Sequence, residues 1–333
     1  MDPALSRFIA QYFQLVDPWD LQYPAAEILK SPTTQKTLYE QMFDEDKIDP
    51  VPPQTYRTRV LKALISKIEE SLSDPDEDEI DSDLLNAYSS LMVQARPSEL
   101  DTVQQLSSVR YTAPTVETRS IITTESRGLI LSSGTTGFRT WEAALSLATF
   151  LSTSAGLDHI RGNRVIELGA GTGLLSMYCA KYLGATHVLA TDGNTALIET
   201  LKSTSFPHNG LVDTSKIRAK VWEWGDPLEL DQGQSTDFDV ALGADVTYDT
   251  DIIPLLVSAI CELFAKHRLR EFILSATIRN VDTFQAFLHE CEKRNLKPER
   301  VPFSSPPFQE QIGFFHKAAT DIRIYRITPR SEN

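Results

Sequence analysis

The chain has 333 residues, of which 41% are hydrophobic and 23% charged, proportions typical of a globular protein and not of a disordered or fibrous one. No uninterrupted apolar run approaches the roughly 18 residues of a membrane span, so we expect no association with a membrane. Three cysteines, Cys179, Cys261 and Cys291, lie far apart in the sequence. They form neither a disulfide framework nor a zinc-binding pattern, so we expect no metal site and a reducing compartment, the cytoplasm.

The net charge of −14 is unevenly distributed. The first 110 residues carry 20 acidic and 10 basic side chains and so account for −10 of it. An acidic surface repels the phosphate backbone of nucleic acids, which argues against a direct nucleic-acid partner, and it suits a protein partner with a basic face. The alternative is that the acidic excess only improves solubility, and the composition leaves both interpretations open.

Apolar residues recur at helical spacing in three stretches of the first 110 residues, 8–16, 56–68 and 83–93. We therefore expect this region to consist of helices joined by polar loops. Between the second and third stretches, residues 74–83 hold seven carboxylates in ten positions, and like charges at that density favour a solvated loop. The alternative for this acidic segment is a docking site for a basic partner.

From about residue 116 onward, short β-branched runs alternate with helical stretches. The runs predicted to be strands are residues 165–168, 188–191, 217–221, 240–243, 272–276 and 322–327. This alternation predicts βαβ units and hence a doubly wound, mostly parallel α/β sheet with helices on both faces. Charged and apolar residues alternate in the last run, which predicts an antiparallel strand at the edge of the sheet.

The strongest motif is a glycine loop. The first predicted strand runs into Gly169, Gly171 and Gly173, which are followed by a helical stretch. Glycine lets the chain turn sharply and lets a ligand approach the backbone, and the start of the helix offers unpaired N–H groups. About 20 residues later the second predicted strand ends in Asp192, whose carboxylate can accept both hydroxyl hydrogens of a ribose. The loop and Asp192 together predict a nucleotide-type cofactor.

The details of the loop favour S-adenosylmethionine over a dinucleotide. The spacing is G-x-G-x-G, whereas the dinucleotide motif is G-x-G-x-x-G. Glu167 precedes the glycines, and no arginine or lysine stands among them to neutralise a pyrophosphate. An acid in this place suits a ligand that carries a sulfonium and an ammonium group.

Two tryptophans lie on either side of the glycine loop in the sequence. Trp224 comes just after the third predicted strand, where an indole ring can pack against adenine, and Trp141 begins a helix ahead of the first strand. Each is expected to contact the cofactor, and the alternative for each is a place in the hydrophobic core.

The acceptor end of the reaction is predicted from the fourth strand, which continues into Asp245 and Tyr248. Ligands of open α/β sheets bind beyond the carboxyl ends of the strands, so both side chains are expected beside the transferred group. N-methyltransferases that act on the planar nitrogen of a nucleobase or an amide carry Asn/Asp-Pro-Pro-Tyr at this place. Here Val246 and Thr247 stand where those enzymes have the two prolines, which favours a flexible amine such as lysine as the acceptor. The alternative is that Asp245 caps the next helix and Tyr248 only packs.

A lysine acceptor must lose its proton before it can react. Its ordinary pKa is about 10.4, so only about one molecule in a thousand is neutral at pH 7.4. Desolvation and a neighbouring cationic sulfur lower that pKa. We expect Asp245 to orient the amine and offset the positive charge that reaches it, while Tyr248 lines the channel for the alkyl stem.

Together these motifs resemble the seven-β-strand protein-lysine methyltransferases with a D-x-x-Y motif. The resemblance covers roughly residues 115–330 and rests on Glu167-Leu-Gly-Ala-Gly-Thr-Gly173, Thr136-Gly-Phe-Arg-Thr-Trp-Glu-Ala-Ala144, Trp224-Gly225 and Gly243-Ala-Asp-Val-Thr-Tyr248. It implies a Rossmann-like, doubly wound seven-stranded sheet whose last strand is antiparallel. It also implies that the cofactor contacts are Trp141, Gly169, Ala170, Gly171, Asp192, Trp224 and Ala244.

The N-terminal motifs are similar to those of the branch that methylates a lysine of translation elongation factor 2. They are Phe8-x-x-Gln11-Tyr-Phe13, Tyr23-Pro24, Tyr56-Arg-Thr-Arg-Val-Leu-Lys62 and the join at residues 132–137. The resemblance implies a helical substrate-recognition domain at residues 1–115, a methyltransferase domain at 116–333, and elongation factor 2 as the protein substrate of a monomeric enzyme. Two alternatives stay open, namely methylation of another lysine or amine and a catalytically inactive binding module.

Overall fold

The computed structural model describes residues 2–72, 79–95, 106–115, 117–126, 136–212, 215–230, 237–317 and 319–330. The chain divides into two compact units, one comprising Met1–Thr112 with Glu125–Leu129 and the other Ala113–Thr124 with Ile130–Asn333. Residues 74–78 of the acidic segment lie outside the described residues, as does the join at 132–135, whereas residues 79–81 have no regular secondary structure and a helix begins at Ser82. The expected loop therefore stays a prediction.

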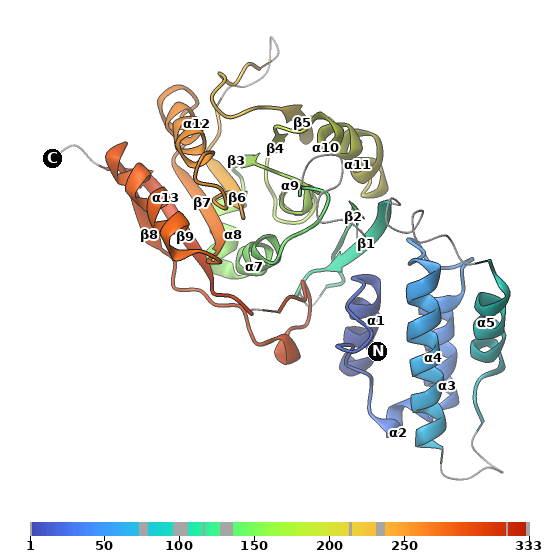
Figure 1. The fold of residues 1–333 in the computed structure, drawn as a ribbon. Helices are drawn as coiled ribbons and strands as arrows, with labels where there is room; N and C mark the ends of the chain where they lie inside the picture. Colours follow the sequence, from blue (N-terminus) through green and yellow to red (C-terminus); the bar gives the residue numbers. More distant parts are fainter. Residues whose placement is uncertain are drawn as a thin grey trace. The chain divides into compact units, whose positions relative to one another are not determined.

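The first unit is built from helices. They are α1 (Pro3–Phe13), α2 (Ala26–Leu29), α3 (Pro32–Leu38), the π-helical turn η1 (Tyr39–Phe43), α4 (Gln54–Ser71) and α5 (Ser82–Val93), shown in blue to teal in Figure 1. The three apolar stretches of the sequence correspond to α1, α4 and α5. Asp2 and Asp81 accept hydrogen bonds from the first N–H groups of α1 and α5, which explains where these two helices begin.

One part of the helical expectation is wrong. Residues 106–110, expected within the helical region, belong to strand β1 (Leu106–Thr112), which pairs with β2 (Ser120–Ser126) in a two-stranded sheet. Val109 and Tyr111 are buried while their neighbours are partly exposed, a period of two that suits a strand. The run is too short for this alternation to stand out in the sequence.

The second unit contains a seven-stranded sheet in the order β5-β4-β3-β6-β7-β9-β8. The strands are β3 (Arg164–Leu168), β4 (His187–Asp192), β5 (Ile217–Val221), β6 (Val240–Ala244), β7 (Glu271–Thr277), β8 (Leu296–Arg300) and β9 (Ile322–Pro329). The first five pair in parallel, and β9 is antiparallel to both β7 and β8. The predicted doubly wound α/β sheet with an antiparallel last strand is confirmed.

Helices cover both faces of this sheet. They are α7 (Glu142–Leu151), α8 (Ser154–Ile160), α9 (Leu174–Lys181), α10 (Thr195–Thr200), η2 (Leu201–Ser205), α11 (Phe206–His208), α12 (Ile253–Lys266), α13 (Val281–Lys293) and the 3₁₀ turn η3 (Phe308–Glu310). In Figure 1, α7 and α9 lie on one face and α12 and α13 on the other. The core on the α12 side joins Leu256, Ile260 and Phe287 to strand residues such as Ile166 and Phe272.

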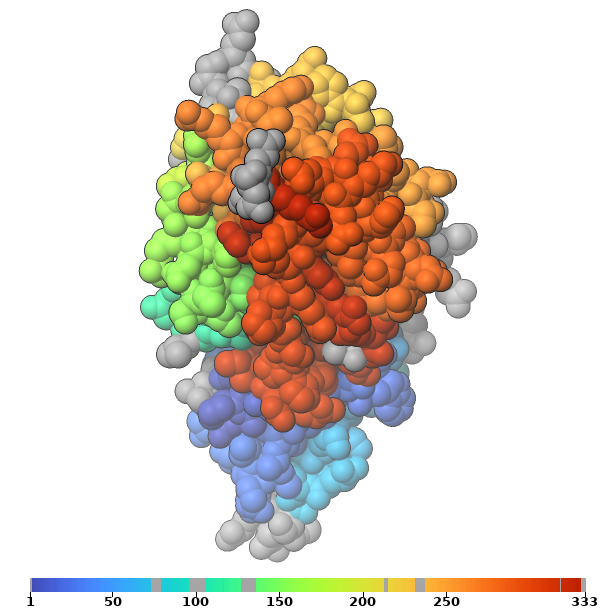
Figure 2. Space-filling view, turned by 90° about the vertical axis from the view of Figure 1, so that its left-hand side faces the viewer, coloured from blue at the N-terminus to red at the C-terminus, as the bar shows by residue number. Residues whose placement is uncertain are grey.

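The last strand is not at the edge of the sheet, so that expectation is wrong. β9 lies between β7 and β8, and β8 forms the edge. Arg326 of β9 forms ion pairs with Glu271 of β7 and with Glu299 of β8. The charged side chain in this strand therefore contacts both neighbouring strands and does not indicate an exposed edge. β8 itself reads Leu-Lys-Pro-Glu-Arg, which has no β-branched residue to predict a strand. Figure 2 views this side, where orange and red residues cover the second unit.

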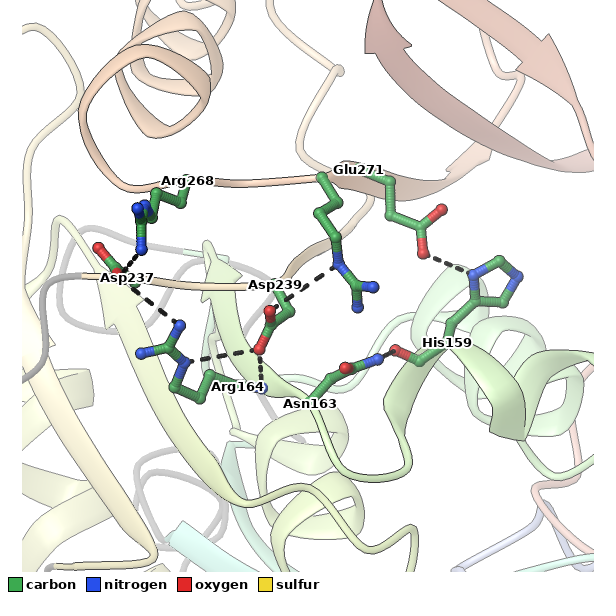
Figure 3. A network of polar contacts seen from close by, with 8 residues as sticks. His159, Asn163, Arg164, Asp237, Asp239, Arg268 and Glu271 are labelled. Atoms are coloured by element: carbon green, nitrogen blue, oxygen red, sulfur yellow. Dashed lines mark hydrogen bonds and ion pairs between the residues drawn. The ribbon is translucent and has the colours of Figure 1, made fainter.

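A network of charged residues joins the starts of the parallel strands (Figure 3). Asp239, just before β6, accepts a 2.8 Å hydrogen bond from the backbone N–H of Arg164 at the start of β3. Glu271 at the start of β7 lies 2.7 Å from Nδ1 of His159 at the end of α8. Further ion pairs join Asp237 to Arg164 and Arg268, and Asp239 to Arg270. The network fixes the amino ends of three strands and thereby the alignment of their carboxyl ends.

Candidate active site

A cavity of about 590 Å³ opens at the carboxyl ends of β3, β4, β6 and β7, a volume in the range of small-molecule sites. Of the residues predicted for the site, all but Gly173 line it, namely Trp141, Glu167, Gly169, Ala170, Gly171, Asp192, Trp224, Ala244, Asp245 and Tyr248. Gly173 instead forms the N-cap of α9. Residues more than 100 positions apart in the sequence thus meet in one place.

The glycine loop has the backbone that its sequence requires. Gly169, Gly171 and Gly173 have φ of +67°, +52° and +74°, which other residues rarely adopt. A Cβ on Gly169 would come within 2.7 Å of a methyl group of Val246, and one on Gly171 within 3.0 Å of the Gly137 carbonyl oxygen. The loop therefore needs glycine for its conformation and for close approach of its neighbours.

Asp192 at the end of β4 joins the loop to the second strand. Its Oδ2 accepts a 3.0 Å hydrogen bond from the N–H of Gly171, and its Oδ1 accepts one of 3.0 Å from the N–H of Asn194. Burial raises the pKa of Asp192, while these two backbone bonds lower it. Each carboxylate oxygen keeps acceptor capacity toward the cavity, as a contact with ribose hydroxyls requires.

Glu167 is a buried acid whose charge is incompletely compensated. Its side chain is 3% exposed, and its Oε2 accepts hydrogen bonds from the backbone N–H and the hydroxyl of Ser176. Burial raises the pKa of Glu167 to about 8, although the Ser176 bonds lower it and the charge of Asp192 raises it further. A cation in the cavity would offset that cost, so Glu167 favours a cationic ligand.

The tryptophans lie at the cavity in different ways. Trp141 is the N-cap residue of α7, and its Nε1 donates a 3.2 Å hydrogen bond to the Thr136 carbonyl. Trp224 lies beside Gly169, since a Cβ there would be 3.6 Å from its ring. Trp222, 3% exposed, belongs to the hydrophobic core and also lines the cavity.

Asp245 is held rigidly at the end of β6. It has φ of +53°, unusual for a residue other than glycine, and its N–H donates to the Ser275 carbonyl. Its carboxylate accepts hydrogen bonds from the N–H of Thr277 at 2.8 Å and the hydroxyl of Thr277 at 3.0 Å. Asp245 does not cap α12, because that helix begins at Ile253 without a side-chain cap.

Tyr248 lies at the rim of the same cavity. It is 63% exposed although it lines the cavity, so it is not a core residue. A phenol in that position is accessible both to solvent and to a group that enters from outside. Asp245 and Tyr248 together place a carboxylate and an aromatic ring at one side of the cavity.

Several residues that line the cavity were not predicted from the sequence. They include Thr136, Arg139, Asn194, Glu223, Leu255 and Arg279. Arg279 follows β7, and the rule that ligands bind beyond the carboxyl ends of strands would have pointed to it. Leu255 lies in the first turn of α12, and the others lie on loops, whose path to the cavity no sequence periodicity indicates.

Comparisons with known proteins place the chain in a family. A family model described as lysine methyltransferase matches residues 130–294. Protein-lysine N-methyltransferase EFM3 of Chaetomium thermophilum is 40% identical over 334 residues, which cover 98% of each chain. The chain belongs to the lysine methyltransferase family. This lysine methyltransferase depends on S-adenosylmethionine and methylates protein lysine, as the sequence predicts.

Other relatives match a smaller part of the enzyme. EFM3 of Saccharomyces cerevisiae is 34% identical over 61% of this chain and 64% of its own. Protein-lysine N-methyltransferase EEF2KMT of Homo sapiens is 28% identical over 55% of this chain and 59% of its own. Among solved structures, magnesium protoporphyrin IX methyltransferase of Synechocystis, with bound SAM, has a TM-score of 0.39 at 16% identity, covering 57% of this chain and 80% of that one.

The lining residues fit the cofactor of this lysine methyltransferase. Glu167 offers a buried carboxyl group whose ionised form a cationic ligand stabilises, and Asp192 offers acceptor positions to hydroxyl groups. Indole rings at Trp141 and Trp224 offer flat apolar surface. Within the described residues, no three His, Cys, Asp or Glu side chains are grouped as metal ligands, and no helix is both long and apolar enough to cross a bilayer.

Proposed function

We propose that this lysine methyltransferase methylates a lysine of translation elongation factor 2, with the acceptor amine beside Asp245 and Tyr248. The observation that carries the acceptor site is that both side chains line the same cavity as the glycine loop and Asp192. The choice of elongation factor 2 rests on the N-terminal motifs around Phe8, Tyr23 and Tyr56 and is supported by similarity to EEF2KMT.

The residues divide the work between cofactor and acceptor. When bound, S-adenosylmethionine supplies a methyl group activated by its cationic sulfur. Glu167 compensates positive charge, Asp192 accepts hydrogen bonds from the ribose, and Trp141 and Trp224 contact the flat ring system. The remaining contacts at the loop come from Gly169, Ala170, Gly171 and Ala244, with Gly173 shaping the turn into α9.

Asp245 and Tyr248 act on the lysine. The Asp245 carboxylate accepts a hydrogen bond from the neutral amine, which aims the nitrogen lone pair at the methyl group, at a separation of about 3 to 3.5 Å before reaction. It also stabilises the positive charge that the nitrogen acquires. The Tyr248 ring packs against the alkyl stem at the exposed rim of the cavity.

The helical unit recognises the folded protein substrate in this proposal. Its excess of acidic residues suits a partner with a basic face, such as a protein that binds the ribosome, and it disfavours direct contact with nucleic acid. We further propose that the enzyme acts as a monomer in the cytoplasm.

Removal of the acceptor carboxylate tests the proposed site. We expect Asp245→Ala to abolish methyl transfer while S-adenosylmethionine still binds, as measured by labelled-methyl incorporation and by calorimetric titration. Asp251→Ala is the matched control, because Asp251 is an exposed acid nearby that does not line the cavity. Near-normal activity of Asp245→Ala would show that the role given to this residue is wrong.

The substrate is tested with labelled cofactor and extract from cells that lack the enzyme. We expect label in elongation factor 2. Label in a different protein would reassign the substrate and leave the chemistry intact. Cofactor binding without any labelled protein would favour the alternative of an inactive binding module.

A further inference from the structure

Arg279 contributes a permanent positive charge to the acceptor side of the cavity. It lies two residues beyond the end of β7, and its Nη2 is 3.1 Å from Oδ2 of Asp245. The guanidinium carbon lies 5.2 Å from the ring centroid of Trp141, and Nη2 is 4.0 Å from a carboxylate oxygen of Glu142. Groups from the end of β6 and the start of α7 thus hold this arginine in place.

The arginine completes the set of donors around Asp245. Oδ1 accepts from the N–H of Thr277, and Oδ2 accepts from both the Thr277 hydroxyl and Arg279. The Asp245 side chain is only 7% exposed, whereas that of Arg279 is 45% exposed. Asp245 is therefore a nearly buried carboxylate whose charge is balanced by a guanidinium that reaches solvent.

This pairing resolves a conflict in the proposed chemistry. An unpaired carboxylate beside the acceptor lysine would stabilise the ammonium form and raise the lysine pKa, yet only the neutral amine has a lone pair for attack. A guanidinium keeps its charge throughout the physiological pH range, so it offsets the carboxylate without competing for a proton. Its charge also repels an ammonium group that comes close to Asp245.

We propose that Arg279 is a positioning residue that sets the protonation state of the acceptor lysine. It fixes one oxygen of Asp245 and offsets part of the charge of that carboxylate, so that the lysine is held as a neutral amine while the carboxylate still stabilises the charge that develops on the nitrogen during transfer. The proton that the ammonium loses passes to solvent, which reaches the exposed Arg279 and Tyr248. This inference rests on the proposed acceptor role of Asp245 and assigns a function to a residue outside the D-x-x-Y motif.

Other titratable groups face the same region and can also affect the pH dependence of the reaction. Those of the cavity wall are Arg139, Glu167, Asp192, Glu223 and Tyr248, and behind Arg279 lies Glu142, which interacts electrostatically with His316. Burial raises the pKa of Glu167 to about 8 in the structure without ligand, and the groups that shift this pKa further are Ser176 and Asp192 and not Arg279. The ratio of each variant to wild type therefore isolates the contribution of Arg279.

The test compares kcat from about pH 6.5 to about pH 9.5, because the acid limb of kcat reports groups in the enzyme–substrate complex. The substrate is purified elongation factor 2 or, if the extract experiment labels another protein, that protein, with cofactor at saturation for each variant. We expect Arg279→Gln to move the acid limb up by about one pH unit, so that kcat falls about tenfold near pH 7.5 and recovers toward wild type at the upper limit.

Two further variants separate charge from structure. Arg279→Lys keeps the charge and is expected to leave the acid limb in place. Thr277→Val removes one neutral hydrogen bond from the same carboxylate oxygen, and we expect it to lower kcat by a similar factor at every pH. Both variants also show whether loss of activity follows from misfolding, which circular dichroism and thermal unfolding report.

The outcomes distinguish this inference from the proposed function. If Arg279→Gln lowers kcat equally at every pH, or if Arg279→Lys shifts the limb as Arg279→Gln does, the charge role is overturned. A lower KM with unchanged or higher kcat in Arg279→Gln would make the arginine an obstacle to the substrate, which also overturns it. Asp245→Ala tests the proposed function separately, because full activity of that variant refutes the acceptor site itself.

Discussion

At the scale of single residues, the raised pKa of Glu167 predicts that cofactor binding depends on pH. Its pKa of about 8 in the structure without ligand means that it is largely protonated at pH 7, while a cationic ligand favours its ionised form. We therefore expect the affinity for S-adenosylmethionine to rise with pH from about 6 to about 8, by up to about tenfold per pH unit. Isothermal titration in buffers of different ionisation enthalpy measures both the affinity and the proton released.

Glu167→Gln is the control for that prediction. It keeps the shape of the side chain and the contact with Ser176 but cannot ionise. We expect weaker binding and a flatter pH dependence, so that the ratio of the two affinities grows with pH. Parallel curves for variant and wild type would show that the pH dependence belongs to the ligand's own amino group.

The sequence was informative about residues that serve local geometry. Gly169 and Gly171 were predicted because a strand, a tight turn and a helix follow one another within ten positions, and the structure gives them positive φ. Asp192 and Asp245 were predicted from the ends of strands, and both line the cavity. The end of β7 could have pointed to Arg279 as a lining residue, but its role depends on two partners, Asp245 and Trp141, from distant parts of the chain. Spatial partnership of this kind has no spacing in the sequence.

At the scale of elements, Glu271 joins β7 to its neighbours at the end of the strand remote from the cavity (Figure 3). Burial alone would raise the pKa of Glu271, but hydrogen bonds from His159 and Arg326 outweigh it and lower the pKa below 4.5. A lowered pKa means that the ionised form stabilises the folded state. That stability is fully present above pH 4.5 and is lost as the pH falls through the lower folded pKa.

Glu271→Gln is therefore expected to reduce the free energy of unfolding by about 2 kcal/mol at pH 7, since two charge-assisted hydrogen bonds are weakened. The difference from wild type should shrink below pH 4.5 as Glu271 itself becomes protonated. Urea unfolding at both pH values measures this. Glu199→Gln, which removes an exposed ion pair with Lys202, should change little. An undiminished difference in acid would mean that packing, and not charge, explains the loss.

Elements were predictable where the chain's own pattern determines them. The runs that became β3, β4 and β6 are buried on both faces of the sheet, which makes them mostly apolar. β8 was not predictable, because three of its five residues are charged. Its place in the sheet depends on pairing with β9, and 21 residues separate the two strands. Because β8 pairs with β9, β9 lies inside the sheet and β8 forms its edge. Strand order at the edge was a property of the assembled sheet and not of either segment.

At the scale of the whole molecule, most of the net negative charge and the cavity lie in different parts of the chain. The first 110 residues carry −10 of the net −14, and among the described residues none that lines the cavity belongs to them. Fold class and cofactor followed from the motifs of the second unit. In the proposed function the surface of the first unit selects the protein substrate, and a surface has no periodicity from which a partner can be deduced.

The two interpretations of the acidic excess differ in their dependence on salt. If the acidic unit attracts a basic face of the substrate, raising the salt concentration from about 50 to about 300 mM should screen that attraction and raise KM for the protein substrate several-fold. The Kd for S-adenosylmethionine should change much less, because the cofactor site lies in a partly enclosed cavity of the other unit. Initial rates with purified substrate and titration of the cofactor in the same buffers provide the comparison. A KM that is independent of salt would leave solubility as the role of the acidic residues, and an equal response of both constants would indicate a general effect of salt on the fold.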